Sequence, residues 1–151
     1  MFSLEAWRKF RRLPAAERGL LVRAVLLLPT MAAALRVVGF PRLTRWLGPR
    51  VARVPAPPVE PAALARIVAL AARRGPVRAR CLTQAVTLWW LLARRGIASQ
   101  VRLGVVKENG ALKAHAWLVG TGGVVAECGS DRNDFVPFDR AVLPSSETHS
   151  R

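Results

Sequence analysis

The sequence predicts an α+β domain in which helices come first and a small antiparallel sheet follows. At 151 residues and 52% hydrophobic content, the chain has room for one ordinary domain with a packed core. Apolar residues recur at helical spacing as far as Gly96 and alternate with a period of two from residue 101 onward. We expect one compact domain: residues 1–59 form amino-terminal helices and a basic connector, residues 60–143 the main core, and residues 144–151 a frayed tail.

Two helices are predicted in the amino-terminal region. Residues 3–12 have the pattern of a short amphipathic helix, and Pro14 suits the first position of the next one. That second helix has one apolar face and contains Pro29, which predicts a kink or a split. Prolines further on predict extended or irregular chain between residues 48 and 61.

Two more helices are predicted in the centre of the chain. Over residues 61–74 apolar side chains recur at i, i+3, i+4 and i+7, and Gly75 with Pro76 supplies a stop. The next helix runs from about Cys81 to Arg95, with arginines complementing its dipole and Gly96 as its cap. Cys81 therefore falls on a first helical turn.

Three strands follow, over residues 101–107, 112–119 and 123–128. Asn109 with Gly110 is a two-residue hairpin signal, and "GTG" at 120–122 can close a three-residue loop. The order predicts an antiparallel meander.

The loop lengths predict which strand residues face each other. A three-residue second loop pairs positions that sum to 242, so His115 is expected opposite Glu127 on one face of the sheet. The carboxylate can then fix the imidazole tautomer and leave the other ring nitrogen free to act as a base. A two-residue first loop makes the sum 219 and sets His115 opposite Gly104, which leaves space beside the ring. A β-bulge would shift this register.

The thiol of Cys81 is the best candidate for that space. A helix amino terminus offers a partial positive charge and unpaired N–H groups that favour a thiolate, and Arg78 and Arg80 add to this effect. The same N–H groups, with the side chain of Gln84, can stabilise an oxyanion. With His115, the sequence thus offers a nucleophile and a base, and the acid opposite the base can orient it.

Non-catalytic interpretations remain open for the same residues. Cysteines in apolar helices are usually inert, His115 between alanines fits a core histidine, and Glu127 fits an exposed edge strand. A zinc site is disfavoured because its four candidate ligands lack short paired spacing, so we expect no metal. Those four residues are Cys81, His115, Cys128 and His149.

The net charge of +15 is unevenly distributed. Residues 1–80 hold most of the basic side chains and only three acidic ones, Glu5, Glu17 and Glu60. Such a field attracts nucleic acid, anionic lipid or an acidic peptide. Because abundant arginine and alanine are also typical of a GC-rich genome, we do not expect nucleic-acid binding.

No membrane span or secretion signal is predicted. Residues 24–35 are a charge-free stretch of 12 residues, short of the roughly 20 that a spanning helix needs. Glu5 and Glu17 precede it, which is unlike a signal peptide. We expect a cytoplasmic protein with reduced thiols and at most peripheral membrane contact.

Several motifs between residues 80 and 128 follow one another in a recognisable order. They are "CL" at the start of a helix that ends in "LLARRGI", a "VRLGV" strand and an "HAW" strand. In this order they resemble the cysteine peptidase of lasso peptide biosynthesis, a member of the transglutaminase-like, papain-related superfamily. The resemblance covers roughly residues 60–140 and implies that a Cys-His-Asp triad cleaves the leader from a ribosomally made precursor peptide. By position, it implies Cys81 as nucleophile and His115 as base.

The third member of the implied triad departs from the family pattern. Glu127 stands where Asp is usual, so its extra methylene changes the geometry. Asp131 has the same strand parity and is the second candidate. Asp134 and Asp139 are too distant unless the chain folds back.

The resemblance also implies partners. A separate small protein recognises the leader, and the product passes to an ATP-dependent macrolactam synthetase. Proteolysis itself needs no cofactor, although the wider maturation system can require ATP. The basic amino-terminal half is either a docking surface for the recognition protein or a solvated arginine-rich surface. Contacts with substrate or partner are expected from Arg78, Arg80, Gly104 and Trp117.

Two other functions fit the same sequence. An acyltransferase or transglutaminase would pass the thioester to an amine instead of water. A non-catalytic basic adaptor would bind an acidic peptide, a membrane or nucleic acid and would not need Cys81.

Overall fold

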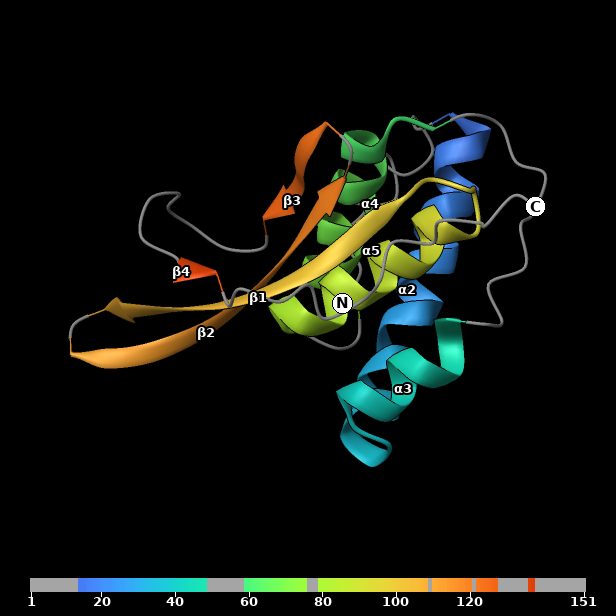
Figure 1. Cartoon of the computed structure of the whole chain (residues 1–151). Coiled ribbons are helices and arrows are strands. Elements are labelled where there is room, and N and C mark those ends of the chain that lie inside the picture. The colour runs from blue at the N-terminus through green and yellow to red at the C-terminus, as the bar shows by residue number, and fades with distance from the viewer. Residues whose placement is uncertain are drawn as a thin grey trace, which may run out of the picture.

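A computed structural model describes residues 14–48, 59–75, 79–108, 110–120, 122–127 and 136–137. The helices precede the strands and pack together, while a long hairpin extends past them (Figure 1). This arrangement confirms the α+β class. The elements are α2 (Ala15–Val37), α3 (Phe40–Leu47), α4 (Pro61–Arg74), α5 (Cys81–Ala93), β1 (Ser99–Glu108), β2 (Ala111–Gly120), β3 (Gly123–Glu127) and β4 (Val136–Pro137). The helix predicted over 3–12 and the tail at 144–151 lie outside the described residues.

The helix α2 runs without a break through Pro29, so the proline does not split it. Pro14 is the residue before the helix rather than its first position. Pro29 has no N–H to donate one turn back. The Thr30 hydroxyl donates instead to the carbonyls of Leu27 at 2.8 Å and Leu26 at 3.3 Å, which supplies local hydrogen bonds around the proline.

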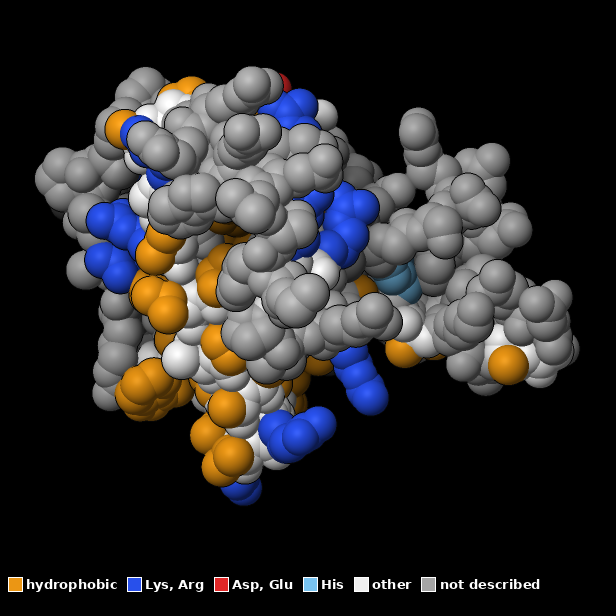
Figure 2. All heavy atoms as spheres, turned by 180° about the vertical axis from the view of Figure 1, so that it is seen from behind, with side chains coloured by type: hydrophobic (Ala, Val, Ile, Leu, Met, Phe, Trp, Pro, Cys, Tyr) orange, Lys and Arg blue, Asp and Glu red, His pale blue; other side chains and the backbone are white. Residues whose placement is uncertain are grey.

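The same helix extends well beyond its charge-free stretch. Residues 17–37 are long and apolar enough to cross a membrane, by length and composition only. One face of α2 nevertheless belongs to the core, because Leu28 and Met31 are buried in it. On the other side, hydrophobic side chains gather over α2 and α3 with arginines beside them (Figure 2). The large exposed ones are Val22, Leu26, Val37, Val38 and Trp46.

A short helix, α3, lies just before the proline-rich connector and was not predicted. Gly39, with φ of 81°, precedes it, and Pro41 occupies its first turn, where a missing N–H has no effect. Leu43 and Leu47 are buried, so the helix is attached to the core by one face.

The central helices follow the sequence closely. α4 has the predicted bounds, and α5 begins at Cys81 but ends at Ala93, two residues earlier than expected. Gly96 has φ of 73°, and its N–H donates to the Ala93 carbonyl at 2.9 Å. The Ile97 N–H reaches back to Leu92 at 3.1 Å. This pair of bonds is a Schellman cap, which closes the end of α5.

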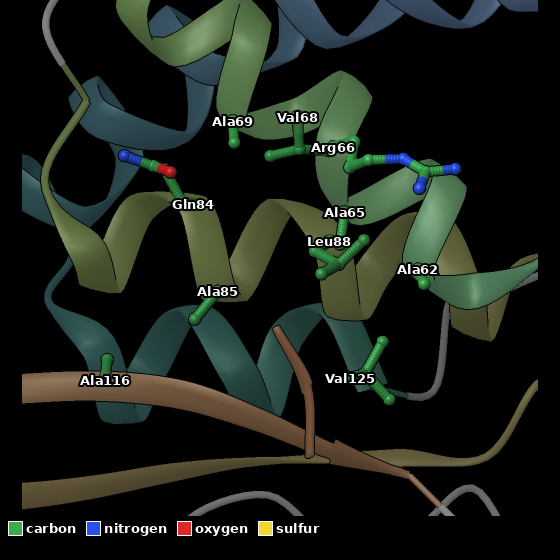
Figure 3. A pocket seen from close by; sticks show the side chains of 10 residues that line it. All are labelled: Ala62, Ala65, Arg66, Val68, Ala69, Gln84, Ala85, Leu88, Ala116 and Val125. Carbon is green, nitrogen blue, oxygen red and sulfur yellow. The ribbon is translucent and has the colours of Figure 1, made fainter. Parts of the chain in front are cut away.

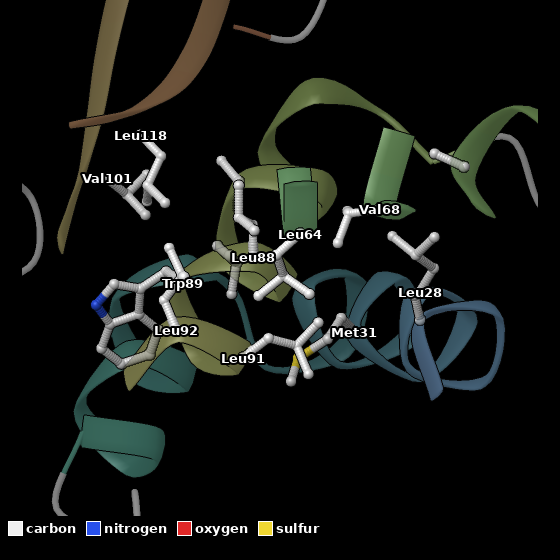
Figure 4. Packing of buried hydrophobic residues seen from close by; sticks show 14 of the residues in the cluster. Leu28, Met31, Leu64, Val68, Leu88, Trp89, Leu91, Leu92, Val101 and Leu118 are labelled. Carbon is white, nitrogen blue, oxygen red and sulfur yellow. The ribbon is translucent and has the colours of Figure 1, made fainter. Parts of the chain in front are cut away.

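The hydrophobic core fills the space between α2, α4, α5 and one face of the hairpin. Leu28, Leu64 and Leu88 come from three different helices and are almost fully buried. Val101 of β1 and Leu118 of β2 point into the same cluster from the sheet (Figure 4). α5 is therefore held between the other helices and the sheet.

The sheet has the strand order β3-β2-β1-β4 and is antiparallel throughout. β1 and β2 pair in the predicted register, with Gly104 opposite His115. The short strand β4 was not predicted. It pairs with β1 so that Pro137 also lies opposite Gly104, which shows that the chain does fold back after β3.

The pairing of β2 with β3 corrects the sequence prediction. Gly120 pairs with Gly123, so the loop has two residues instead of three, and a bulge beyond Val119 shifts the register once more. Glu127 consequently lies opposite Trp117, and the prediction that it faces His115 directly is wrong. The shorter loop and the bulge each shift the register by one residue, which makes a total shift of two. Because strand residues alternate with a period of two, position 127 keeps the alternation that the sequence predicted.

Candidate active site

Cys81 is the first residue of α5 and is half-buried. The first intrahelical bond runs from the Gln84 N–H to the Arg80 carbonyl at 3.1 Å. The N–H groups before it have no acceptor within the helix and are free for an incoming oxygen. Cys81 is a free thiol, and Arg80 beside it is exposed. Arg78 lies outside the described residues.

Gln84 has a clear structural role. Its amide nitrogen donates to the Ala79 carbonyl at 2.8 Å, which fastens the segment before Cys81 to the first turn of α5. Gln84 also lines a cavity of about 310 Å³ between α4, α5 and the sheet (Figure 3). Ala85 and Ala116 line the same cavity, so the first turns of α5 lie against the middle of β2. One amide hydrogen of Gln84 is committed to Ala79, and the second is the one that an oxyanion contact would use.

His115 lies in the middle of β2 and is half-buried. Its ring stacks on that of Trp117, with 6.2 Å between centroids and 20° between planes. Gly104, its partner on β1, is buried. Because β4 pairs at the same point, Gly104 lies in a row between His115 and Pro137.

The two faces of β2 have different neighbours. Ala116 and Leu118 are buried on the helix side, so strand alternation assigns His115 and Trp117 to the opposite face. The structure thus places the candidate nucleophile and the candidate base on two elements that pack together, α5 and β2.

The candidate acids are only partly located. Glu127 ends β3, and its backbone position lies two residues along from the one opposite His115. Asp131, Asp134 and Asp139 are outside the described residues. The strand β4 nevertheless lies between the last two in the sequence and pairs beside Gly104, so the fold-back that they would need does occur. Which acid orients His115 stays a prediction.

Arg102 lies beside the candidate site residues and was not singled out from the sequence. It lies opposite Trp117 on β1, and its Nε is buried with no hydrogen-bond partner in the described part of the chain. Alternation places it on the face that carries His115. The sequence could have indicated this position, because the register predicted for the first hairpin places residue 102 opposite residue 117, as the structure does.

A metal site finds no support among the residues that the structure describes, which contain no group of three His, Cys, Asp or Glu able to hold an ion. Two of the four zinc candidates, Cys128 and His149, lie outside those residues.

The family model of the transglutaminase-like superfamily matches residues 24–139. The chain belongs to this superfamily. No curated protein and no solved structure matches it significantly. The superfamily match begins within α2 and ends two residues after β4, so it includes both Cys81 and His115. Membership is compatible with a cysteine peptidase and with an acyltransferase, and it confirms the broader part of the resemblance seen in the sequence.

Proposed function

We propose that this transglutaminase-like protein is a cysteine peptidase that removes the leader from a lasso peptide precursor. One observation carries the proposal: the superfamily match includes a cysteine at the amino terminus of α5 and a histidine on β2, the strand against which α5 packs. The motifs around these two residues support the finer assignment.

In the proposed reaction, the Cys81 thiolate attacks the scissile carbonyl of the leader, and His115 accepts the thiol proton. Backbone N–H groups at the start of α5, with Gln84, stabilise the oxyanion. His115 then protonates the leaving amine, and an acyl-enzyme remains. Water, deprotonated by His115, attacks the thioester and releases the leader with a free carboxylate.

The faces of β2 set a condition for this reaction. The imidazole must reach the sulfur around the edge of β2, since its side chain leaves the strand on the face away from α5. Within the described residues, β3 pairs with β2 only from Trp117 to Gly120. Catalytic hydrogen bonds are often long in a free enzyme and shorten when substrate binds, and we propose that the leader closes this gap.

The proposal includes partners. A separate recognition protein presents the leader, and a macrolactam synthetase takes the product in the cytoplasm. The peptidase step itself uses no metal or organic cofactor. We place Arg78, Arg80, Gly104 and Trp117 along the bound peptide.

The test is incubation of the protein with a candidate precursor and its recognition protein, read by mass spectrometry. We expect two fragments whose masses sum to that of the precursor plus water. Cys81→Ala should abolish cleavage and retain partner binding, whereas Cys128→Ala, the matched control, should cleave normally. Cleavage by Cys81→Ala at the wild-type rate would overturn the proposal.

An acyltransferase is the second candidate, because superfamily membership supports it equally. It would form the same thioester at Cys81 and pass the acyl group to an amine. A conjugate in place of two fragments would identify it. Function that survives Cys81→Ala entirely would instead indicate a basic adaptor.

A further inference from the structure

We infer that a hollow between α2 and the carboxyl-terminal end of α5 binds a carboxylate of an acidic peptide segment. We call it the arginine hollow, and it has a volume of about 370 Å³. The proposal goes beyond the peptidase reaction and does not require catalysis. The hollow is lined by Arg23, Leu26, Leu27, Trp90, Leu91, Arg94 and Arg95.

Three guanidinium groups from two elements meet at this hollow. Arg23 comes from α2, and Arg94 and Arg95 follow α5 directly. Within the described residues, no carboxylate pairs with any of them. Like charges held together without a counter-ion repel each other, so an anion would relieve the arrangement.

Among the three arginines, Arg95 shows most clearly that a hydrogen-bond acceptor and a negative charge are missing among the described residues. One terminal nitrogen donates to the Leu91 carbonyl at 3.0 Å, but its Nε is buried without an acceptor among the described residues. Burial lowers the pKa of this guanidinium, and the charges of Arg23 and Arg94 lower it further. A bound anion could accept from Nε and offset both effects.

The apolar side chains that line the arginine hollow indicate that its ligand has an apolar group beside the anion. Arg94 lies over the Trp90 ring at 4.7 Å, so the indole forms an oriented wall. Leu26 is 64% exposed at the same site. A bare inorganic ion would leave this apolar surface exposed to water. A peptide with a carboxylate next to an apolar side chain fits both parts of the hollow. A guanidinium binds the carboxylate with two parallel hydrogen bonds, and the apolar side chain packs against the leucines and Trp90.

The arginine hollow is remote from the thiol. Cys81 is the first of the 13 residues of α5, and the hollow lies at the other end of this helix, about 18 Å away along its axis. A peptide held there would be anchored away from the reacting bond, so the hollow would act as a separate docking point.

The experiment uses the Cys81→Ala protein, so that cleavage cannot interfere, and isothermal titration calorimetry. The probes are the peptides Ac-Glu-Leu-Glu-Leu-amide and Ac-Gln-Leu-Gln-Leu-amide, inorganic phosphate, and phosphatidylcholine vesicles containing phosphatidylglycerol. The test variant adds Arg23→Gln and Arg94→Gln. The matched control adds Arg36→Gln and Arg73→Gln, which remove the same charge from exposed sites elsewhere.

We expect the Glu peptide to bind at least about tenfold more tightly than the Gln peptide, and the test variant to lose at least about tenfold in affinity while the control stays within about twofold. Circular dichroism should show unchanged folding in both variants. Equal losses in test and control variants, equal affinity for the two peptides, or no peptide binding would overturn the proposal. So would binding of phosphate or vesicles, but not of peptide, that depends on Arg23 and Arg94. Failure of peptide cleavage by the wild-type protein would leave these affinities unaffected and would count only against the peptidase.

Discussion

At the scale of single residues, the register between β2 and β3 bears on the proposal that Glu127 is the acid that orients His115. Residues directly opposite each other in a sheet have Cβ atoms about 5 Å apart, whereas diagonal neighbours are about 7–8 Å apart. The register places Glu127 diagonal to His115. An acid that serves the imidazole from there needs a longer side chain than aspartate provides.

This geometry predicts the effect of shortening the acid. Glu127→Asp should lower kcat by about tenfold or more, and Glu127→Gln by about a hundredfold, because a general base loses its orienting carboxylate. The measurement is the initial rate of leader cleavage with folding checked by circular dichroism. Asp131→Asn is the control and should change the rate little. A larger loss from Asp131→Asn than from Glu127→Gln would assign the role to Asp131.

At the scale of elements, short sequence patterns correctly predicted the features that depend on interactions between residues close together in the chain. The apolar stripe of α4 and its stop at Gly75 gave the correct bounds. The position of Cys81 at a helix start and the pairing of Gly104 with His115 also followed from short sequence signals. These features depend on periodicity, caps and one two-residue turn, all of which lie within a few residues of each other.

The elements that could not be predicted depend on distant or ambiguous information. α3 begins with Gly39 and Pro41, residues that usually mark a break but that also suit the first turn of a helix. β4 exists only because the chain returns to β1. The bulge between Leu118 and Val119 leaves Val125 without a partner in the register, and Val125 lies within 2.9 Å of where a Cβ on Gly120 would be. The position of the acid was wrong for this reason.

Two glycines, Gly19 inside α2 and Gly96 after the end of α5, should respond oppositely to the same substitution. Gly96→Ala should lower the free energy of unfolding by about 1 kcal/mol, because the cap of α5 needs a positive φ. Gly19→Ala should raise it by about 0.5–1 kcal/mol, since Gly19 is inside α2 with nothing within 4 Å of a new Cβ. Urea unfolding measures both. A gain of stability in Gly96→Ala would contradict the cap.

At the scale of the whole molecule, α2 is a wall of the core although it resembles a membrane span in length and composition. Leu28→Ala should therefore lower the free energy of unfolding by about 2–5 kcal/mol, because Leu28 is 1% exposed. Leu26→Ala, at 64% exposure, should stay within about 0.5 kcal/mol. Urea unfolding without detergent makes the comparison. Equal small effects would mean that α2 does not pack in solution as it does in the structure.

The division of sulfur and imidazole between a helix and a strand has a kinetic consequence. In the proposed chemistry, the enzyme is competent only while the helical layer and the sheet stay packed so that the imidazole can reach the sulfur when the leader binds. A small displacement of one layer against the other would leave every helix and strand intact but would abolish peptidase activity. We therefore expect the rate of leader cleavage to fall at a lower urea concentration than the far-ultraviolet circular dichroism signal. If both are lost at the same urea concentration, the two layers separate only when the whole protein unfolds.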